Sequence, residues 1–266
     1  MPLLLGGQLH QHRPVLRGLP EVLHAVSDMR SEAALIWSFR ARAEVEAADR
    51  FARLAYRLSG AGAAIQVVQM AQSAASDEIR HAELCADLAR HFGSEPKKRT
   101  GGDPPEVAPS GLVARERVLY EVVALSCVTE TLSAALLGAM AEQARDDRVR
   151  DAVHSILRDE IEHSRLGWAH LSLEHARGYG RFLGDYLPAM LQGTIDDELF
   201  REGDDPNEKH DTELAGWGAL RRADRRVLFT ATMREVVFPG LERFGVDTSA
   251  GARWLVERES GPSVTC

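Results

Sequence analysis

The chain has 266 residues, and 44% of them are hydrophobic, so it can bury the core of one large domain or two small ones. Its formal net charge of −8 argues against a surface for nucleic acid or for anionic membranes. No apolar run approaches the ~20 residues of a membrane-spanning helix, and Leu3-Leu4-Leu5 is too short for a signal peptide. We therefore expect neither a nucleic-acid nor a membrane partner.

The cysteines indicate the compartment. Cys85, Cys127 and Cys266 form no CxxC pair and no even framework. This pattern excludes a rubredoxin-type iron site and suits a reducing environment, so we expect a cytoplasmic protein.

The first part of the chain predicts an irregular segment followed by a helical hairpin. Residues 1–28 are punctuated by proline and glycine and are expected to be irregular, apart from a short helix near 21–27. Ser31 is the expected N-cap of a long helix that ends near Gly60. Gly60-Ala61-Gly62 predicts a tight turn into a second long helix, which Gly93 and Pro96 terminate.

The second part predicts another hairpin and then an extension. Residues 93–110 are rich in glycine, proline and charge; at roughly 60 Å of reach they can span a helix of about 30 residues, which is roughly 45 Å long. A third helix is expected over 111–144 and a fourth from Asp147 to about 176, so the links are short, long and short. Residues 178–266 predict a helical extension: a helix over 181–200 broken at Pro188, a polar loop at 203–209, and a helix over 220–237 closed by Pro239. The expected fold is all-α, with a bundle at 29–177.

One pentapeptide pattern, Asp-Glu-Ile-x-His, occurs twice, as Asp77-Glu78-Ile79-Arg80-His81 and as Asp159-Glu160-Ile161-Glu162-His163. Glutamate and histidine three residues apart share one face of a helix, where they form half of a metal site. Two such halves in a bundle core form a two-metal site. Composition alone predicts about one Glu-x-x-His, and we assign Glu21 to His24 to chance because it lacks the shared Asp and Ile. Two full copies by chance are very improbable.

Four glutamates interrupt apolar helical stripes, where a charge is costly unless it is compensated. Glu44 lies sixteen residues before Gly60 and Glu78 lies sixteen after Gly62, so an antiparallel hairpin sets them level. In the second hairpin Glu130 lies sixteen residues before Asp146, and Glu160 thirteen after Asp147. All four carboxylates are therefore expected in one layer near the middle of the bundle.

On Glu44, Asp77-Glu78-x-x-His81, Glu130 and Asp159-Glu160-x-x-His163, the chain resembles the ferritin-like di-iron carboxylate superfamily, over residues 30–177. The resemblance implies a ferritin-like four-helix bundle holding two iron ions, with manganese as an alternative. It implies one metal at Glu44, Glu78 and His81, and the other at Glu130, Glu160 and His163, with Glu78 and Glu160 as bridges. Asp77 and Asp159 would accept hydrogen bonds from the histidines; the alternative is that they are surface charges.

The donor chemistry is consistent with this resemblance. Four carboxylates balance the charge of two divalent ions, and oxygen ligands with one imidazole per metal suit iron or manganese. Six protein ligands leave coordination positions open for O2 or water.

Three functions remain open: a di-iron oxidase or oxygenase, an iron-oxidising storage protein, and a non-catalytic bundle with a vestigial site. We favour the first, with O2, a small organic substrate and an electron-donor protein as partners, because a long C-terminal extension does not suit the cages of storage ferritins. Most neighbours of the ligands are small. Ala48 and Ser133 are accordingly predicted to line a substrate pocket, although small residues also let helices pack closely.

Overall fold

The computed structural model describes residues 19–96, 104–195, 198–201 and 211–260. These residues form helices and no strand, which confirms the all-α prediction. The helices are α1 (Leu19–Gly60), α2 (Ile65–Phe92), α3 (Ala114–Val122), η1 (Val123–Glu130), α4 (Thr131–Gln143), α5 (Asp147–Ala176), α6 (Leu183–Thr194), α7 (Asp211–Ala215), α8 (Arg222–Thr232), η2 (Met233–Val237), α9 (Phe238–Arg243) and α10 (Ser249–Glu259).

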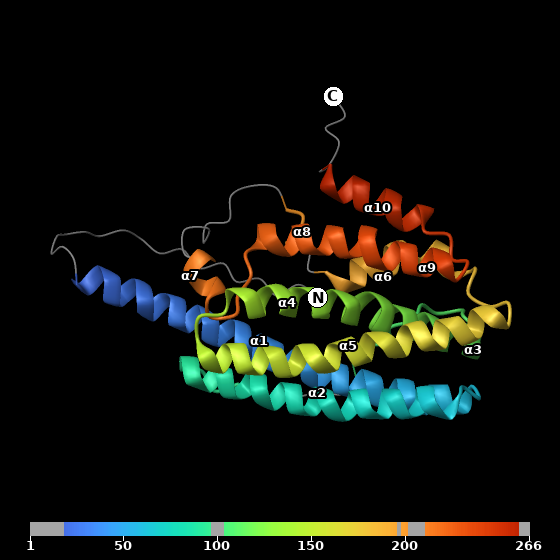
Figure 1. Ribbon diagram of the computed structural model, residues 1–266, viewed down its shortest axis with the longest axis horizontal. Coiled ribbons are helices and arrows are strands. Elements are labelled where there is room, and N and C mark those ends of the chain that lie inside the picture. The colour runs from blue at the N-terminus through green and yellow to red at the C-terminus, as the bar shows by residue number, and fades with distance from the viewer. Residues whose placement is uncertain (1–18, 97–103, 196–197, 202–210, 261–266) are drawn as a thin grey trace.

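Four long helices lie alongside one another in a bundle: α1, α2, α5 and the continuous helix made of α3, η1 and α4 (Figure 1). Their links are short, long and short, as expected. Local chemistry ends the helices where the sequence predicts: Gly93 caps α2 at φ 105°, and the Asp146 side chain accepts hydrogen bonds from Arg148 N and Val149 N at the start of α5.

The long connection is fastened to α1 by arginines. Arg53 donates hydrogen bonds to the carbonyls of Pro104 and Pro105, and Arg57 pairs with Glu106 and with the buried Glu121. These contacts hold the connection along the bundle, so it bridges the two hairpins at a defined place.

The C-terminal helices α6, α8, α9 and α10 lie over the face of the bundle formed by α3, η1 and α4 (Figure 1). A hydrophobic core that includes Leu119, Val123, Leu187 and Phe229 joins the two layers. Residues 178–266 therefore include helices packed on the bundle, while the predicted loop at 203–209 lies outside the described residues.

Two boundaries differ from the predictions. The first helix starts at Leu19, so Ser31 lies inside α1 and does not cap it. The physical reason is that Pro20 falls in the first turn, where the missing N–H costs nothing. Residues 19–28 are therefore helical and not irregular, while residues 1–18 lie outside the described residues.

The second difference concerns the prolines at 188 and 239. Pro188 lies inside α6, which runs unbroken from Leu183 to Thr194 and ends before residue 200, and Pro239 does not close the last predicted helix. The helix continues through η2 into α9. The π-helical register of η2, immediately before Pro239, shifts the backbone hydrogen bonds from i−4 to i−5, which removes the clash that a proline causes within an α-helix.

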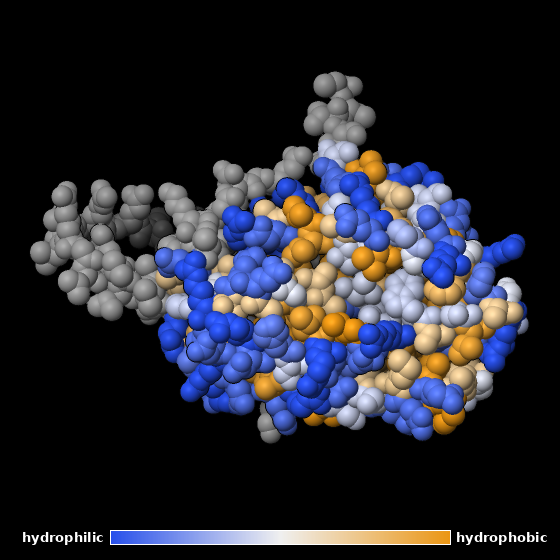
Figure 2. Space-filling view, viewed as in Figure 1, coloured by the Kyte–Doolittle hydropathy of each residue, from blue (hydrophilic) through white to orange (hydrophobic). Residues whose placement is uncertain are grey.

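One helix, Ala114–Gln143, is long and apolar enough to cross a membrane by length and composition alone, contrary to the expectation that no such run exists. In the structure 56% of its most apolar window is buried inside the protein, and it carries the buried Glu121 and Glu130. On the face shown in Figure 2, apolar side chains lie in small patches among hydrophilic ones. A core helix meets the same criterion, so the composition of this helix does not by itself place it in a membrane.

Candidate metal centre

The six predicted ligands come from four helices and meet in one layer. Glu44 lies on α1, Glu78 and His81 on α2, Glu130 at the end of η1, and Glu160 and His163 on α5. All except the half-buried Glu44 are buried. The layer separates two apolar cores of the bundle, one around Trp37, Leu88 and Val153 and the other around Phe51, Val67 and Leu166.

The ligand atoms form two overlapping groups. Within each group, one atom of every residue lies within 4.8 Å of the others; the groups are Glu44, Glu78, His81 and Glu160, and Glu78, Glu130, Glu160 and His163. Glu78 and Glu160 belong to both groups, which is the position of a carboxylate that bridges two ions. The two oxygens of Glu78 face the two histidines: Oε2 lies 3.1 Å from His81 Nδ1 and Oε1 lies 3.1 Å from His163 Nδ1. The cluster could therefore hold metal ions.

Each histidine points one ring nitrogen at the cluster and the other at an aspartate. The Nδ1 atoms lie 3.1 Å from Glu78 Oε2 in His81 and 3.2 Å from Glu160 Oε2 in His163. The Nε2 atoms cross over: His81 Nε2 lies 3.2 Å from Asp159 Oδ2, and His163 Nε2 lies 3.3 Å from Asp77 Oδ2. The aspartate of each pentapeptide thus orients the histidine of the other.

Arg80 joins the two aspartates from outside the cluster. Its guanidinium donates to Asp77 Oδ1 at 2.7 Å and also to Asp159 Oδ2. Burial acts to raise the pKa of Asp159, but hydrogen bonds from His81, Arg158 and Arg80 outweigh it and hold the pKa below its ordinary value. Asp159 therefore remains a carboxylate that can accept from the imidazole. In the sequence, the only sign that Arg80 pairs with both aspartates is its place inside the first pentapeptide. The second pentapeptide has Glu162 at the same position.

The electrostatics of the metal-free cluster favour added positive charge. Burial, followed by repulsion from Glu78 and Glu160, raises the pKa of Glu44; burial, followed by repulsion from Glu160, raises the pKa of Glu130. Burial also acts to raise the pKa of Glu78, but hydrogen bonds with His163 and His81 outweigh it and lower the pKa to about 2. Protons on Glu44, Glu130 and the histidines thus neutralise the cluster when no cation does so.

The protons that the folded cluster holds predict that the stability of the metal-free protein depends on pH. Burial acts to lower the pKa of His163, but hydrogen bonds with Glu160 and Glu78 raise it from 6.5 to about 10. The folded chain then holds an extra proton between these values. The contribution of His163 to the free energy of unfolding is therefore fully present below pH 6.5 and is lost as the pH rises toward 10. The raised pKa values of Glu44 and Glu130 act in the same direction above pH 4.5.

The measurement is thermal unfolding of chelator-treated protein across this pH range. His163→Gln should remove much of the decline between pH 6.5 and 10, whereas His154→Gln, at an exposed position of the same helix, should retain it. Identical pH profiles for the two variants would contradict the assignment of the proton to His163.

Glu130 is presented by a π-helical turn that the sequence did not predict. The eight residues of η1 have the wider π register, and Thr129 Oγ1 donates to Ala124 O at 2.9 Å, five residues back. Such turns inside α-helices occur frequently at functional sites. Apolar periodicity carries no signal for this change, because α and π turns place apolar residues on nearly the same face over one turn.

Gly167 lets η1 approach α5 closely beside the cluster. A Cβ atom at this position would lie 2.7 Å from Cys127 Sγ, 2.7 Å from Ser126 Cβ and 2.8 Å from Cys127 N. The small neighbours of the ligands on these two helices therefore serve close packing, one of the two readings that the sequence left open.

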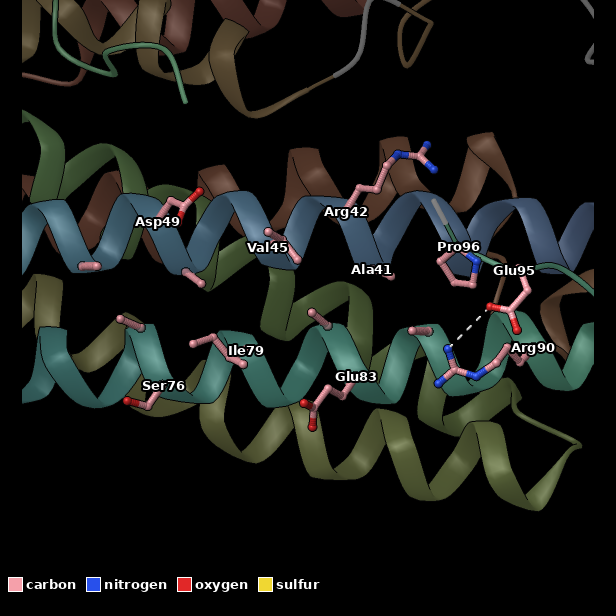
Figure 3. A pocket seen from close by; sticks show the side chains of 15 residues that line it. Ala41, Arg42, Val45, Asp49, Ser76, Ile79, Glu83, Arg90, Glu95 and Pro96 are labelled. Carbon is pink, nitrogen blue, oxygen red and sulfur yellow. Dashed lines mark ion pairs between the residues drawn. The ribbon is translucent and has the colours of Figure 1, made fainter. Parts of the chain in front are cut away.

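Of the two predicted pocket residues, Ala48 lines a groove that Ser133 does not line. This groove, about 700 Å³ in volume, runs between α1 and α2 (Figure 3). Val45 and Ile79 project into it, Ala41 and Ala48 form part of its wall, and Ser133 is not among its lining residues. The groove opens on the outer side of the helix pair.

Comparison of the chain with protein-family models, with curated proteins and with solved structures finds no significant match. The function is therefore inferred from the geometry and chemistry of the cluster.

Proposed function

We propose that the chain binds two iron ions, or alternatively manganese, at this cluster and uses them to oxidise a small organic substrate with O2. The observation that supports this function best is the pair of overlapping ligand groups that share Glu78 and Glu160. In this proposal the chain is a member of the ferritin-like di-iron carboxylate superfamily that its repeated pentapeptide resembles, and an electron-donor protein reduces it between turnovers.

The residues present fit such a cofactor. Four carboxylates offer negative charge for two divalent ions, and each histidine can offer its cluster-facing nitrogen while an aspartate holds the other. Bound iron would supply the capacity to activate O2. The contribution of the chain is to orient the ligands, to bury them from bulk water, and to fix the imidazole tautomers through Asp77, Asp159 and Arg80.

The C-terminal helices that cover one face of the bundle favour an oxidase over a storage protein. The C-terminal helices occupy the face of α3, η1 and α4 with an extensive apolar interface, and this face is then not free to pack against further subunits in a cage. The thiol of Cys85 lies 4.0 Å from Glu44 Oε1. Burial raises the pKa of this thiol well above its ordinary value, so Cys85 stays protonated and is read as a core residue.

The test starts with elemental analysis of protein from an iron-supplemented culture, where about two metal ions per chain are expected. Chelation should lower the melting temperature, because a ligand that binds only the native state stabilises it, and ferrous iron should restore it. Ferrous protein mixed with O2 should then consume O2 repeatedly when a reductant is supplied.

The matched control is Glu142→Ala, which removes an exposed carboxylate from the helix that follows Glu130. This variant should keep the metal content of the wild type, whereas Glu130→Ala should not. Equal metal content in both variants would refute the site, and retention of far more iron than two ions per chain would favour storage over oxidation.

A further inference from the structure

The inner face of α5 is apolar on one side of the cluster and carries buried polar side chains on the other. Before the ligands this face carries Val149, Val153 and Ile156; after them His170 and Glu174 are buried alongside Leu166, Gly167 and Leu171. His170 lies seven residues after His163 and Glu174 eleven after it, which places both on the face of the ligands and about two and three turns away. Packing against these leucines does not require a buried histidine and a buried glutamate, so the two polar side chains call for another explanation.

Two polar atoms beside this face of α5 have no hydrogen-bonding partner among the residues that the structure describes. They are Ser126 Oγ, on a fully buried side chain, and Nδ1 of His170, whose residue is 4% exposed. Ser126 lies one turn before Glu130 on η1 and packs against Gly167, so it lies between the cluster and His170. Buried polar atoms of this kind are usually satisfied by internal water.

Beyond His170, the buried polar residues of α5 end at Glu174, which pairs with two arginines. The Glu174 carboxylate is 2% exposed and accepts hydrogen bonds from Arg115 Nε at 2.7 Å, Arg115 Nη2 at 3.0 Å and Arg177 Nη1 at 2.9 Å. Both arginine side chains reach solvent, with 38% and 50% of their surface exposed. The Glu174 carboxylate therefore lies between the buried His170 and the solvent-exposed arginines near the end of the bundle.

We propose that Ser126, His170 and Glu174, with bridging water, form a proton path between the carboxylate cluster and solvent. The path rests on the proposed function, because it serves the metal cluster. A proton released by the cluster passes through the Ser126 hydroxyl to one nitrogen of His170. The other nitrogen of His170 then releases a proton toward Glu174 and solvent. No electron moves and no bond to carbon changes.

The charges around the path favour protons over metal ions. A cation entering at this end would meet the guanidinium groups of Arg115 and Arg177. Burial lowers the pKa of His170; the nearby Glu174 opposes this shift, and Arg115 and Arg177 add to it. The imidazole is therefore neutral at neutral pH, with one nitrogen free to accept a proton while the other donates.

The test follows protons while the metal-free protein binds Mn²⁺, because metal ligands must lose their protons on binding. Stopped-flow mixing in weak buffer with a pH-indicator dye reports proton release, and elemental analysis reports the final metal content. We expect His170→Gln, which keeps hydrogen-bonding capacity but cannot carry a proton at neutral pH, to slow release by at least about tenfold while binding the same amount of Mn²⁺. His154→Gln, on the same helix but exposed, should release protons as the wild type does.

Ser126→Ala is the second variant, and it should slow release in the same way with a smaller disturbance of packing. Added imidazole should restore the rate in His170→Ala, which a purely structural role would not produce. Wild-type release rates in His170→Gln and Ser126→Ala, with normal Mn²⁺ content, overturn the path and leave the metal site standing. Failure of the wild type to bind Mn²⁺ or iron overturns the metal site and the path together.

Discussion

Replacing Glu160 with glutamine is expected to remove more metal than the same replacement at Glu44. Glu160 contributes an atom to both ligand groups, whereas Glu44 contributes to one. Glu44→Gln should therefore leave about one ion per chain, and Glu160→Gln should leave less than that. Glutamine keeps the shape of the side chain, so packing is matched and only the charge and one oxygen are lost.

The same pair of variants should have different effects on the metal-free fold. Burial and the neighbouring carboxylates raise the pKa of Glu44, which favours its neutral form in the metal-free protein, so glutamine should change the metal-free fold little. Glu160 is the hydrogen-bonding partner of His163 at 3.2 Å, and removing one member of a buried charged pair typically costs about 3–5 kcal/mol. Elemental analysis and denaturant unfolding of both variants measure these effects. Equal metal loss in the two variants would contradict the bridging role.

The cluster was predictable because three local signals agreed. The repeated pentapeptide gave glutamate and histidine a common helical face, the glutamates at 44 and 130 interrupted apolar stripes, and turn residues set the register of each hairpin. The all-α fold and the short, long, short links followed from the same turn signals, since Gly93 and Asp146 act on their own neighbours. Local chemistry of this kind can be read without knowing what packs against it.

Other features depended on contacts between distant segments. The exchange of aspartates between the two motifs requires α2 and α5 to lie side by side at a particular height, and nothing in either pentapeptide encodes that height. The π register of η1 is similar: it accompanies the contact between Ser126 and Gly167, which are 41 residues apart. The start of α1 was missed for a different reason: a short helix near 21–27 was expected, but Ser31 was taken as the N-cap of a separate helix, although serine also occurs inside helices.

The contact at Gly167 leads to the second large expected effect, a loss of stability in Gly167→Ala. A methyl group there would meet Cys127 N and Cys127 Sγ at 2.8 and 2.7 Å, and backbone cannot move aside as a flexible side chain can. Overpacking of this kind costs about 3 kcal/mol, and the helix propensity of alanine returns about 1 kcal/mol, so a net loss of about 2 kcal/mol is expected.

The matched control is Gly138→Ala on α4, where a methyl group would meet nothing within 4 Å. This variant should gain up to about 1 kcal/mol from helix propensity, so the two glycine substitutions should have opposite signs. Gly167→Ala should also weaken metal binding, because pushing η1 away from α5 displaces Glu130 from Glu160. Denaturant unfolding of the metal-free proteins and metal titration of both variants provide the measurements. If Gly167→Ala matched Gly138→Ala in stability and in metal affinity, the close approach of η1 to α5 could not be what positions Glu130.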